Sequence, residues 1–262
     1  MVLNDELVLP SQHVEEYYNA AGGCNAQNLL PLPVLAQHII DISTIHANRI
    51  GVGYDRLIAN GMAWVLSRLS IEMCGGWPGV NEVYALRTWV ESYNRHFSER
   101  NIEITGRGGR LLGFARAIWM PIRVADRKGG SLDGIDELRH VVCSRPCPID
   151  KAPKLTAVSR EGDVDVSGYT FRYTDCDNNR HVNTTRYIEL LLNQHTLDFY
   201  DHNLLERFDI AFHHESYFGQ VAEVVTRNEG DGVYNAEIIG PEGVTTRARM
   251  RFGKWDFHPD GI

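Results

Sequence analysis

The sequence predicts an α+β protein of two similar units, each with one helix followed by antiparallel strands. Three observations lead to this prediction: a helical pattern of apolar residues occurs twice, four strand-like runs follow each occurrence, and short segments correspond between the halves. At 262 residues, the chain has room for one large or two small domains.

The first unit begins with a predicted helix over residues 32–50, where apolar side chains recur every three or four positions. Strand-like runs rich in Trp, Val, Ile and Tyr follow at about 62–73, 81–93, 100–106 and 111–124. The second unit repeats this order. Its helix is predicted over 187–200, and its strands at about 207–213, 220–228, 233–239 and 244–255.

Particular segments also correspond between the units. Residues 69–79 match residues 208–219 in shape, and both 103–110 and 237–244 predict a hairpin with a Gly-rich turn. The stretch from 126 to 166 contains several prolines, a Gly-Gly pair and many charges, so we interpret it as a linker between the units.

Composition argues against several classes of protein. The net charge of −8 disfavours a nucleic-acid binder, which would carry a basic surface. There is no apolar run of about 18 residues, so we expect no membrane span. The first residues lack the pattern of a signal peptide, and the five cysteines are odd in number and lack the spacing of a zinc site. We therefore expect a reduced, cytoplasmic protein.

The segment from Asp175 to Asn183 is dense in polar and ionisable side chains. Asp177, Asn179 and His181 alternate, so an extended backbone would place a carboxylate, an amide and an imidazole on one side. An apolar helical pattern follows directly. A site for acyl transfer next to a helix N-terminus is the functional hypothesis that this combination suggests.

Three segments together resemble the acyl-acyl carrier protein thioesterases of plant plastids and their bacterial relatives. Residues 175–183 resemble that family's Asp-x-Asp-x-Asn-x-His-x-Asn signature, residues 212–216 its aromatic-x-x-Glu-Cys segment, and residues 64–72 its Trp-Val-Val-Ser-Arg strand. Glu215 follows His181 by 34 residues (215 minus 181), which is similar to the family spacing. The resemblance extends from about residue 10 to residue 255.

The resemblance implies a tandem hot-dog fold of two antiparallel sheets that are joined side by side, each wrapped around a long helix. Residues 1–150 would form the N-terminal unit, which houses the acyl chain and is not catalytic, and residues 151–262 the unit with the catalytic groups. The implied activity is hydrolysis of long- or medium-chain fatty acyl-acyl carrier protein to free fatty acid and carrier protein, which ends fatty acid synthesis. No cofactor and no metal are implied.

The implied catalytic set is Asp177, Asn179, His181 and Glu215. Glu215 is the candidate general base, with a nucleophilic carboxylate as the alternative, and His181 could orient water or transfer a proton. Asn179 would bind the water or the carbonyl oxygen, and Asp177 would orient His181 or a backbone segment. N–H groups at the start of the following helix would stabilise the oxyanion. Plant members commonly have Cys where this chain has Ser216, so a mechanism through a thiolate there is excluded.

Other polar residues near the motif have simpler interpretations. Asn183 stands where a helix N-cap belongs, Ser216 lacks the glycines of a nucleophile elbow, and Cys176 alternates away from the polar side into packing. His213 and His214 are neighbours on a predicted strand and point to opposite faces, so shared metal binding is disfavoured.

By the same resemblance, an acyl groove in the first unit would be lined by residues such as Met62, Trp64, Leu66 and Trp89, although each also suits an ordinary core position.

The implied partner, acyl carrier protein, is acidic and would require a basic docking patch. One candidate is the seven basic side chains between residues 100 and 130, and another is an alternating stripe on the last strand, Arg247, Arg249 and Arg251. A solvated sheet face is the simpler explanation of either. An acyl-CoA thioesterase and a non-catalytic acyl-binding module remain alternative functions, and a hot-dog dehydratase is disfavoured. The sequence does not determine the preferred chain length or whether the protein is a monomer or a homodimer.

Overall fold

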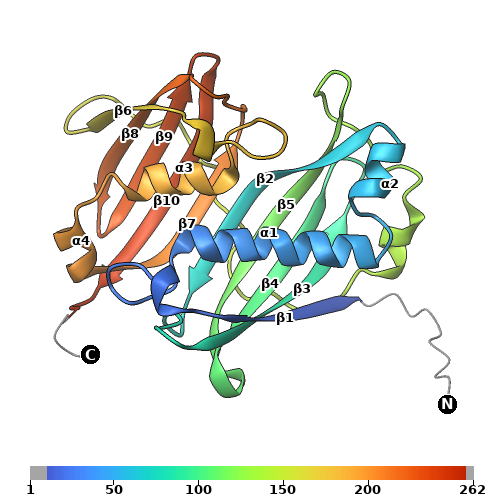
Figure 1. The fold of residues 1–262 in the computed structure, drawn as a ribbon, viewed down its shortest axis with the longest axis horizontal. Coiled ribbons are helices and arrows are strands. Elements are labelled where there is room, and N and C mark those ends of the chain that lie inside the picture. The colour runs from blue at the N-terminus through green and yellow to red at the C-terminus, as the bar shows by residue number, and fades with distance from the viewer. Residues whose placement is uncertain (1–10, 258–262) are drawn as a thin grey trace.

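The computed structural model describes residues 11–257, except for the side chains of residues 136 and 137. Within this range, ten strands form one antiparallel sheet in the order β1-β3-β4-β5-β2-β7-β10-β9-β8-β6 (Figure 1). The strands are β1 Gln12–Tyr18, β2 Met62–Met73, β3 Val83–Tyr93, β4 Ser98–Thr105, β5 Leu111–Arg123, β6 Asp165–Thr170, β7 Asn203–Phe212, β8 Val221–Gly230, β9 Val233–Gly240 and β10 Gly243–Lys254. The α-helices are α1 Leu32–Arg49, α2 Tyr54–Ala59, α3 Thr184–Leu192 and α4 Leu197–His202.

The sheet consists of two halves with the same strand order. The first half runs β1-β3-β4-β5-β2, and the second repeats that order as β6-β8-β9-β10-β7. The predicted repeat is therefore confirmed in the topology. The resemblance implied two sheets joined side by side, whereas the structure has one continuous sheet, because β2 and β7 pair from Arg68↔Ala211 to Glu72↔Arg207 and join the halves. This pairing removes two strand edges, whose N–H and C=O groups would otherwise need other partners.

One helix lies across each half, α1 on the first and α3 on the second (Figure 1). The predicted helix over 32–50 is confirmed as α1, and Pro33 stands in its first turn, where a missing N–H costs no hydrogen bond. Leu35, Ile39 and Ile42 of α1 are fully buried. A helix packed on an antiparallel sheet in this way is the arrangement of the hot-dog fold.

The helix predicted over 187–200 is interrupted. α3 ends at Leu192, and α4 starts after Thr196, whose hydroxyl accepts a hydrogen bond from the N–H of Phe199 at 3.1 Å. A short polar side chain that caps N–H groups in this way begins a new helix, even where the apolar period continues. The second half therefore has a helix of 9 residues in place of the long helix that was expected.

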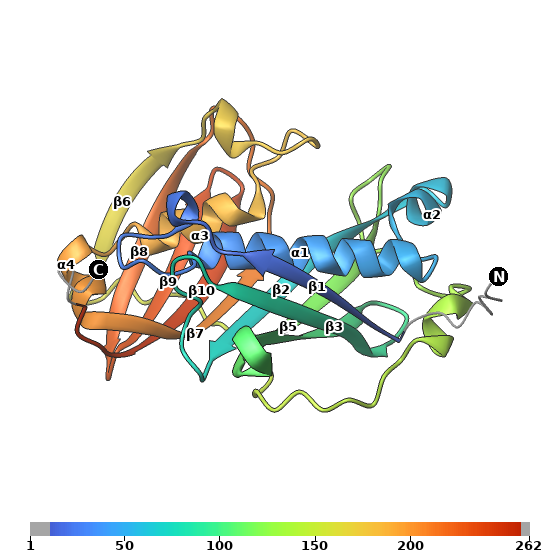
Figure 2. The ribbon, with the colours of Figure 1, turned by 60° about the horizontal axis from the view of Figure 1, so that its bottom comes forward.

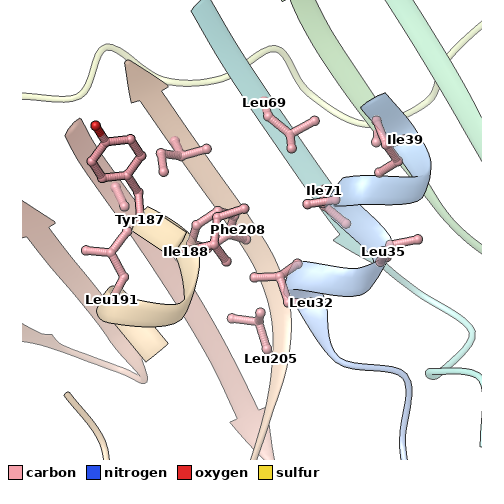
Figure 3. Packing of buried hydrophobic residues seen from close by; sticks show 14 of the residues in the cluster. Leu32, Leu35, Ile39, Leu69, Ile71, Tyr187, Ile188, Leu191, Leu205 and Phe208 are labelled. Carbon is pink, nitrogen blue, oxygen red and sulfur yellow. The ribbon is translucent and has the colours of Figure 1, made fainter. Parts of the chain in front are cut away.

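One hydrophobic core extends beneath both helices (Figure 3). Leu32 and Leu35 of α1 and Ile188 of α3 belong to the same cluster as Ile71 of β2 and Phe208 of β7, and each is at most 4 % exposed. Burial of this apolar surface is the main force that holds the two halves together.

The predicted linker between the halves packs against the helix and the sheet of the first half. Its first part contributes Leu132 and Leu138 to a cluster at the C-terminal end of α1. Its second part crosses the face of the sheet opposite α1, where Ile149 packs on Trp89 and Phe114 (Figure 2).

Three elements escape the sequence prediction: β1, β6 and α2. β1 and β6 are the two edge strands of the sheet, and most of their residues remain partly exposed, so their apolar pattern is weak. α2 is a helix of 6 residues, too short for a helical period to be recognised. No helix within residues 11–257 has the length and hydrophobicity to cross a membrane.

Candidate active site

Two segments of the second half meet where the halves join: the loop 176–183 before α3 and the segment 213–217 after β7. The N–H of Val182 donates to the Ser216 carbonyl at 2.8 Å, and His181 and Tyr217 form an isolated antiparallel bridge. From the first half, the turn after β5 lies at the same end of the sheet as the loop before α3 (Figure 1).

The loop before α3 is a tight turn. The N–H of Asp177 donates to the His181 carbonyl at 2.8 Å, and the N–H of Arg180 donates to the Asp177 carbonyl at 3.0 Å. Arg180 has a left-handed backbone conformation, with φ of 66°. The expected alternation of Asp177, Asn179 and His181 along an extended backbone is therefore wrong, because the chain reverses direction between the first and the last of them.

The Asp177 carboxylate holds this turn together. Its Oδ1 accepts the backbone N–H of Asn179 at 2.8 Å and that of His181 at 3.1 Å. Asp side chains that bind an N–H two residues further on stabilise turns of this kind. Of the two roles expected for Asp177, the geometry agrees with the one that orients a backbone segment.

Glu215 and His181 lie side by side, as the resemblance implies. His181 Nδ1 is 3.4 Å from Glu215 Oε1. Arg127 of the first half contacts the same carboxylate oxygen, and the Tyr217 hydroxyl lies 3.5 Å from Oε2. The Glu215 side chain is 34 % exposed, so water has access to it. Sequence reasoning noticed Arg127 only as one of several basic residues between 100 and 130, and it did not single out Tyr217.

The electrostatic surroundings favour the neutral form of His181. Burial lowers the pKa of His181 below its ordinary value of 6.5, and the Arg127 guanidinium lowers it further, while the Asp177 charge acts in the opposite direction. A neutral imidazole can accept a proton on one nitrogen and donate from the other, which suits a group that transfers protons. The ring is also fixed by Tyr217, which packs edge-on at 5.1 Å between ring centroids.

Three other residues of the motif are placed as follows. Asn179 is exposed, and its side chain forms no hydrogen bond within the described chain, so the structure does not bring it to Glu215. Asn183 is the N-cap of α3, as predicted, because its Oδ1 accepts the N–H of Thr185 at 2.9 Å. Cys176 is half-buried, and its thiol donates to the Arg172 carbonyl at 3.6 Å, so a buried packing role for it stays a prediction.

Ser216 has the surroundings of a structural residue. It is fully buried, its N–H donates to the Tyr187 hydroxyl at 3.0 Å, and its own hydroxyl has no hydrogen-bond partner among the described residues. His213 and His214 are exposed. Across residues 11–257, no three His, Cys, Asp or Glu side chains are grouped so that they could hold a metal ion.

The start of α3 offers fewer donors for an oxyanion than expected. The N–H of Asn183 donates to the Asp175 carbonyl at 2.8 Å, and that of Arg186 donates to the Asn183 carbonyl at 3.0 Å. The N–H of Thr185 is used by the cap. These three groups are therefore occupied within the protein. The N–H of Thr184 donates to no acceptor among the described residues, so oxyanion binding by the start of α3 stays a prediction for Thr184 alone.

The residues expected to line an acyl groove fall on two faces of the sheet. Met62 and Trp64 pack against the cluster at the end of α1, and Leu66 packs against the main core, each remaining partly exposed. Trp89 is fully buried on the opposite face, where its Nε1 donates to the Arg145 carbonyl of the linker at 3.0 Å. Trp89 cannot line the same groove, because its position in β3 directs it away from α1.

The basic stripe on β10 is largely neutralised. Arg247 Nε is 2.6 Å from Glu237 Oε1, and Arg251 Nε is 3.3 Å from Glu206 Oε2. Arg249 is exposed and has no ion pair within the described residues. A docking role for this stripe stays a prediction, and Arg249 is the residue that can test it.

Comparisons with known proteins identify relatives of both halves. The acyl-ACP thioesterase N-terminal domain matches residues 10–134, and the acyl-ACP thioesterase C-terminal domain matches residues 158–251. A chloroplastic acyl-[acyl-carrier-protein] hydrolase of Cuphea viscosissima is 25 % identical over 237 residues, which cover 84 % of this chain and 56 % of the relative. A chloroplastic palmitoyl-acyl carrier protein thioesterase of Arabidopsis thaliana is 22 % identical over 204 residues, which cover 74 % and 49 %. The chain thus spans about half the length of these relatives.

Solved structures match over nearly the whole chain. An acyl-ACP thioesterase from Bacteroides thetaiotaomicron has 28 % sequence identity and a TM-score of 0.86, with 93 % of this chain and 98 % of that chain covered. The 12:0-ACP thioesterase from Umbellularia californica has 14 % identity and a TM-score of 0.84, with 94 % and 98 % covered, and shows likeness of fold alone. With both halves matched in order, the chain belongs to the acyl-ACP thioesterase family.

Proposed function

We propose that this protein hydrolyses the thioester between a fatty acyl chain and acyl carrier protein, and so releases the fatty acid. The observation that carries the proposal is the approach of His181 Nδ1 to Glu215 Oε1, 3.4 Å apart, at the junction of the halves. A neutral imidazole beside a water-accessible carboxylate supplies both proton transfers that thioester hydrolysis requires. Family membership supports the choice of substrate class.

Each residue of the site has a distinct part in this reaction. Glu215 removes a proton from water, which attacks the thioester carbon. His181 passes the proton to the departing thiolate. Asp177 holds the turn that carries His181, and Asn179, exposed at the tip of that turn, is free to bind the substrate.

The acyl chain would lie on the helix-facing side of the first half. Met62, Trp64 and Leu66 are partly exposed apolar side chains on β2, the strand that joins the half carrying Glu215. The matching strand orders support two hot-dog units fused through β2 and β7. Burial of one methylene contributes about 0.8 kcal/mol, so a flat groove would distinguish neighbouring chain lengths only about fourfold.

The proposal is tested by thiol release from matched acyl-acyl carrier protein and acyl-CoA substrates. Wild-type protein should release thiol from the carrier-protein substrate, and Glu215→Gln should reduce the rate by roughly 10²- to 10⁴-fold. Glu242→Gln, which changes an exposed glutamate in the turn between β9 and β10, is the matched control and should be as active as wild type. Preference for the CoA substrate would identify an acyl-CoA thioesterase, and absence of release from both would leave an acyl-binding module.

A further inference from the structure

Arg127 connects the first half of the protein to the candidate base of the second. It is separated from Glu215 by 88 positions in the chain, yet its guanidinium contacts the Glu215 carboxylate. We propose that Arg127 is a positioning residue of the hydrolytic site, which keeps Glu215 ionised and directed toward the attacking water. The inference rests on the hydrolysis proposed above, and it gives the first half a part in catalysis.

The backbone fixes Arg127 for this contact. In the turn after β5, the N–H of Arg123 donates to the Lys128 carbonyl at 2.8 Å, and the N–H of Arg127 donates to the Arg123 carbonyl at 2.9 Å. The Arg123 side chain adds two hydrogen bonds to Asp126, at 3.0 and 2.9 Å. Arg127 has φ of 57°, a left-handed conformation that residues with a side chain seldom adopt. A turn held this tightly presents the Arg127 side chain in a defined direction.

The Arg127–Glu215 pair contributes little to the stability of the fold. The Arg127 side chain is 42 % exposed and that of Glu215 is 34 % exposed. Water screens ion pairs as accessible as this one. An unfavourable backbone conformation at a weakly stabilising pair points to a role in the site.

The groups that face Glu215 come from three elements. Arg127 follows β5, His181 lies in the loop before α3, and Tyr217 follows β7. Asp177 affects these groups through His181. Its charge raises the pKa of His181, whereas burial and Arg127 lower it. With His181 neutral, Arg127 supplies the positive charge of this group.

The chemistry requires Glu215 to be ionised at the first step. The water oxygen bonds to the thioester carbon, one water proton moves to Glu215, and the carbonyl π electrons move to oxygen. When the intermediate collapses, the C=O bond re-forms, the C–S bond breaks, and the thiolate takes up that proton through His181. The other water proton stays on the product acid until it ionises. A neighbouring guanidinium favours the ionised carboxylate, so Arg127 extends turnover to lower pH.

The test compares the pH dependence of kcat/KM in wild type and in three variants. Arg127→Gln should move the acidic limb upward by about one pH unit, because an opposite charge within about 4–6 Å shifts carboxylate ionisation by about 1–3 units and this pair is partly exposed. Arg127→Lys keeps the positive charge, so its acidic limb should stay close to that of wild type. Lys128→Gln removes the same charge from the next residue and should leave the limb unchanged.

A ¹³C NMR titration of the Glu215 side-chain carboxyl, assigned by comparison with Glu215→Gln, identifies the responding group. This readout is needed because Arg127 also lowers the pKa of His181. A higher titration midpoint in Arg127→Gln than in wild type supports the proposal. Equal midpoints, or an acidic limb that Lys128→Gln moves as far, would overturn it. Failure of wild-type protein to hydrolyse any acyl thioester would instead refute the proposed function, and the titration would still decide whether Arg127 controls Glu215.

Discussion

Substitution of Asp177 distinguishes a carboxylate that shapes the loop from one that reacts. Asp177→Ala removes two hydrogen bonds, to the N–H groups of Asn179 and His181. Hydrogen bonds to a charged group contribute about 1.5–3 kcal/mol each, and water replaces part of this at a half-exposed site. We expect a net loss of about 1.4–2.8 kcal/mol in the ordering of the loop, which corresponds to a loss of about 10- to 100-fold in kcat/KM.

Asp177→Asn retains an oxygen acceptor at the same place and should lose less than about fivefold, because a neutral acceptor makes weaker bonds to the same two groups. Glu215→Gln is the matched comparison, since it also replaces a carboxylate by an amide, and it should lose roughly 100-fold or more. The measurement is the rate of thiol release from acyl-acyl carrier protein, with circular dichroism to verify that each variant is folded. If Asp177→Asn were as inactive as Glu215→Gln, the Asp177 carboxylate would take part in the chemistry and the structural interpretation would be wrong.

Four further outcomes can be checked. Because burial lowers the pKa of His181, the unfolded chain binds more protons than the folded protein below about pH 6.5. The free energy of unfolding should therefore fall as pH drops through this range. His181→Gln should flatten that dependence in urea titrations. Phe208→Ala should cost about 3–5 kcal/mol in the same assay, and a loss below about 1 kcal/mol would contradict a core shared by both halves. Arg249→Glu should raise KM for the carrier-protein substrate and not for a CoA thioester, and an unchanged KM would remove the β10 stripe as a docking surface. Arg100 is buried on the helix-facing side of the first half, 2.7 Å from His46 of α1, and burial lowers its pKa to about 10. Because the acyl chain is proposed to lie on the same side, Arg100→Met should shift preference toward longer chains, and an identical chain-length profile would refute this.

The sequence predicts elements well where one local pattern decides them. α1 and most strands follow from apolar periodicity, and the cap at Asn183 follows from its residue type and position. The loop before α3 shows the limit of this reasoning. Alternating polar residues suggest an extended chain, but the hydrogen bonds of Asp177 to the loop backbone close a turn instead. The predicted single helix over 187–200 shows the same limit, since the Thr196 side chain caps α4 as a separate helix.

In the candidate site, too, some features were predicted from the sequence and others were not. The approach of Glu215 to His181 was expected from the motifs, and the structure places the two groups 3.4 Å apart. The expected role of Trp89 in the groove is wrong, and three of the four N–H groups expected to bind an oxyanion at the start of α3 are already hydrogen-bonded within the protein. The role of Trp89 depends on the direction of its side chain, and that of the α3 N–H groups depends on the hydrogen bonds they already make. Neither the direction nor the hydrogen bonds can be read from residue type or spacing.

The sequence by itself determined the family, the repeated order of helix and strands, and the pair of residues on which the proposed chemistry depends. These features are local, because periodicity, turn residues and short motifs act within a few positions of the chain. Only the tertiary structure decided that β2 and β7 join one sheet and that Arg127 reaches Glu215 across 88 positions. Contacts of this kind depend on how distant segments pack, and the energy of that packing is distributed over the whole core rather than recorded in any one segment.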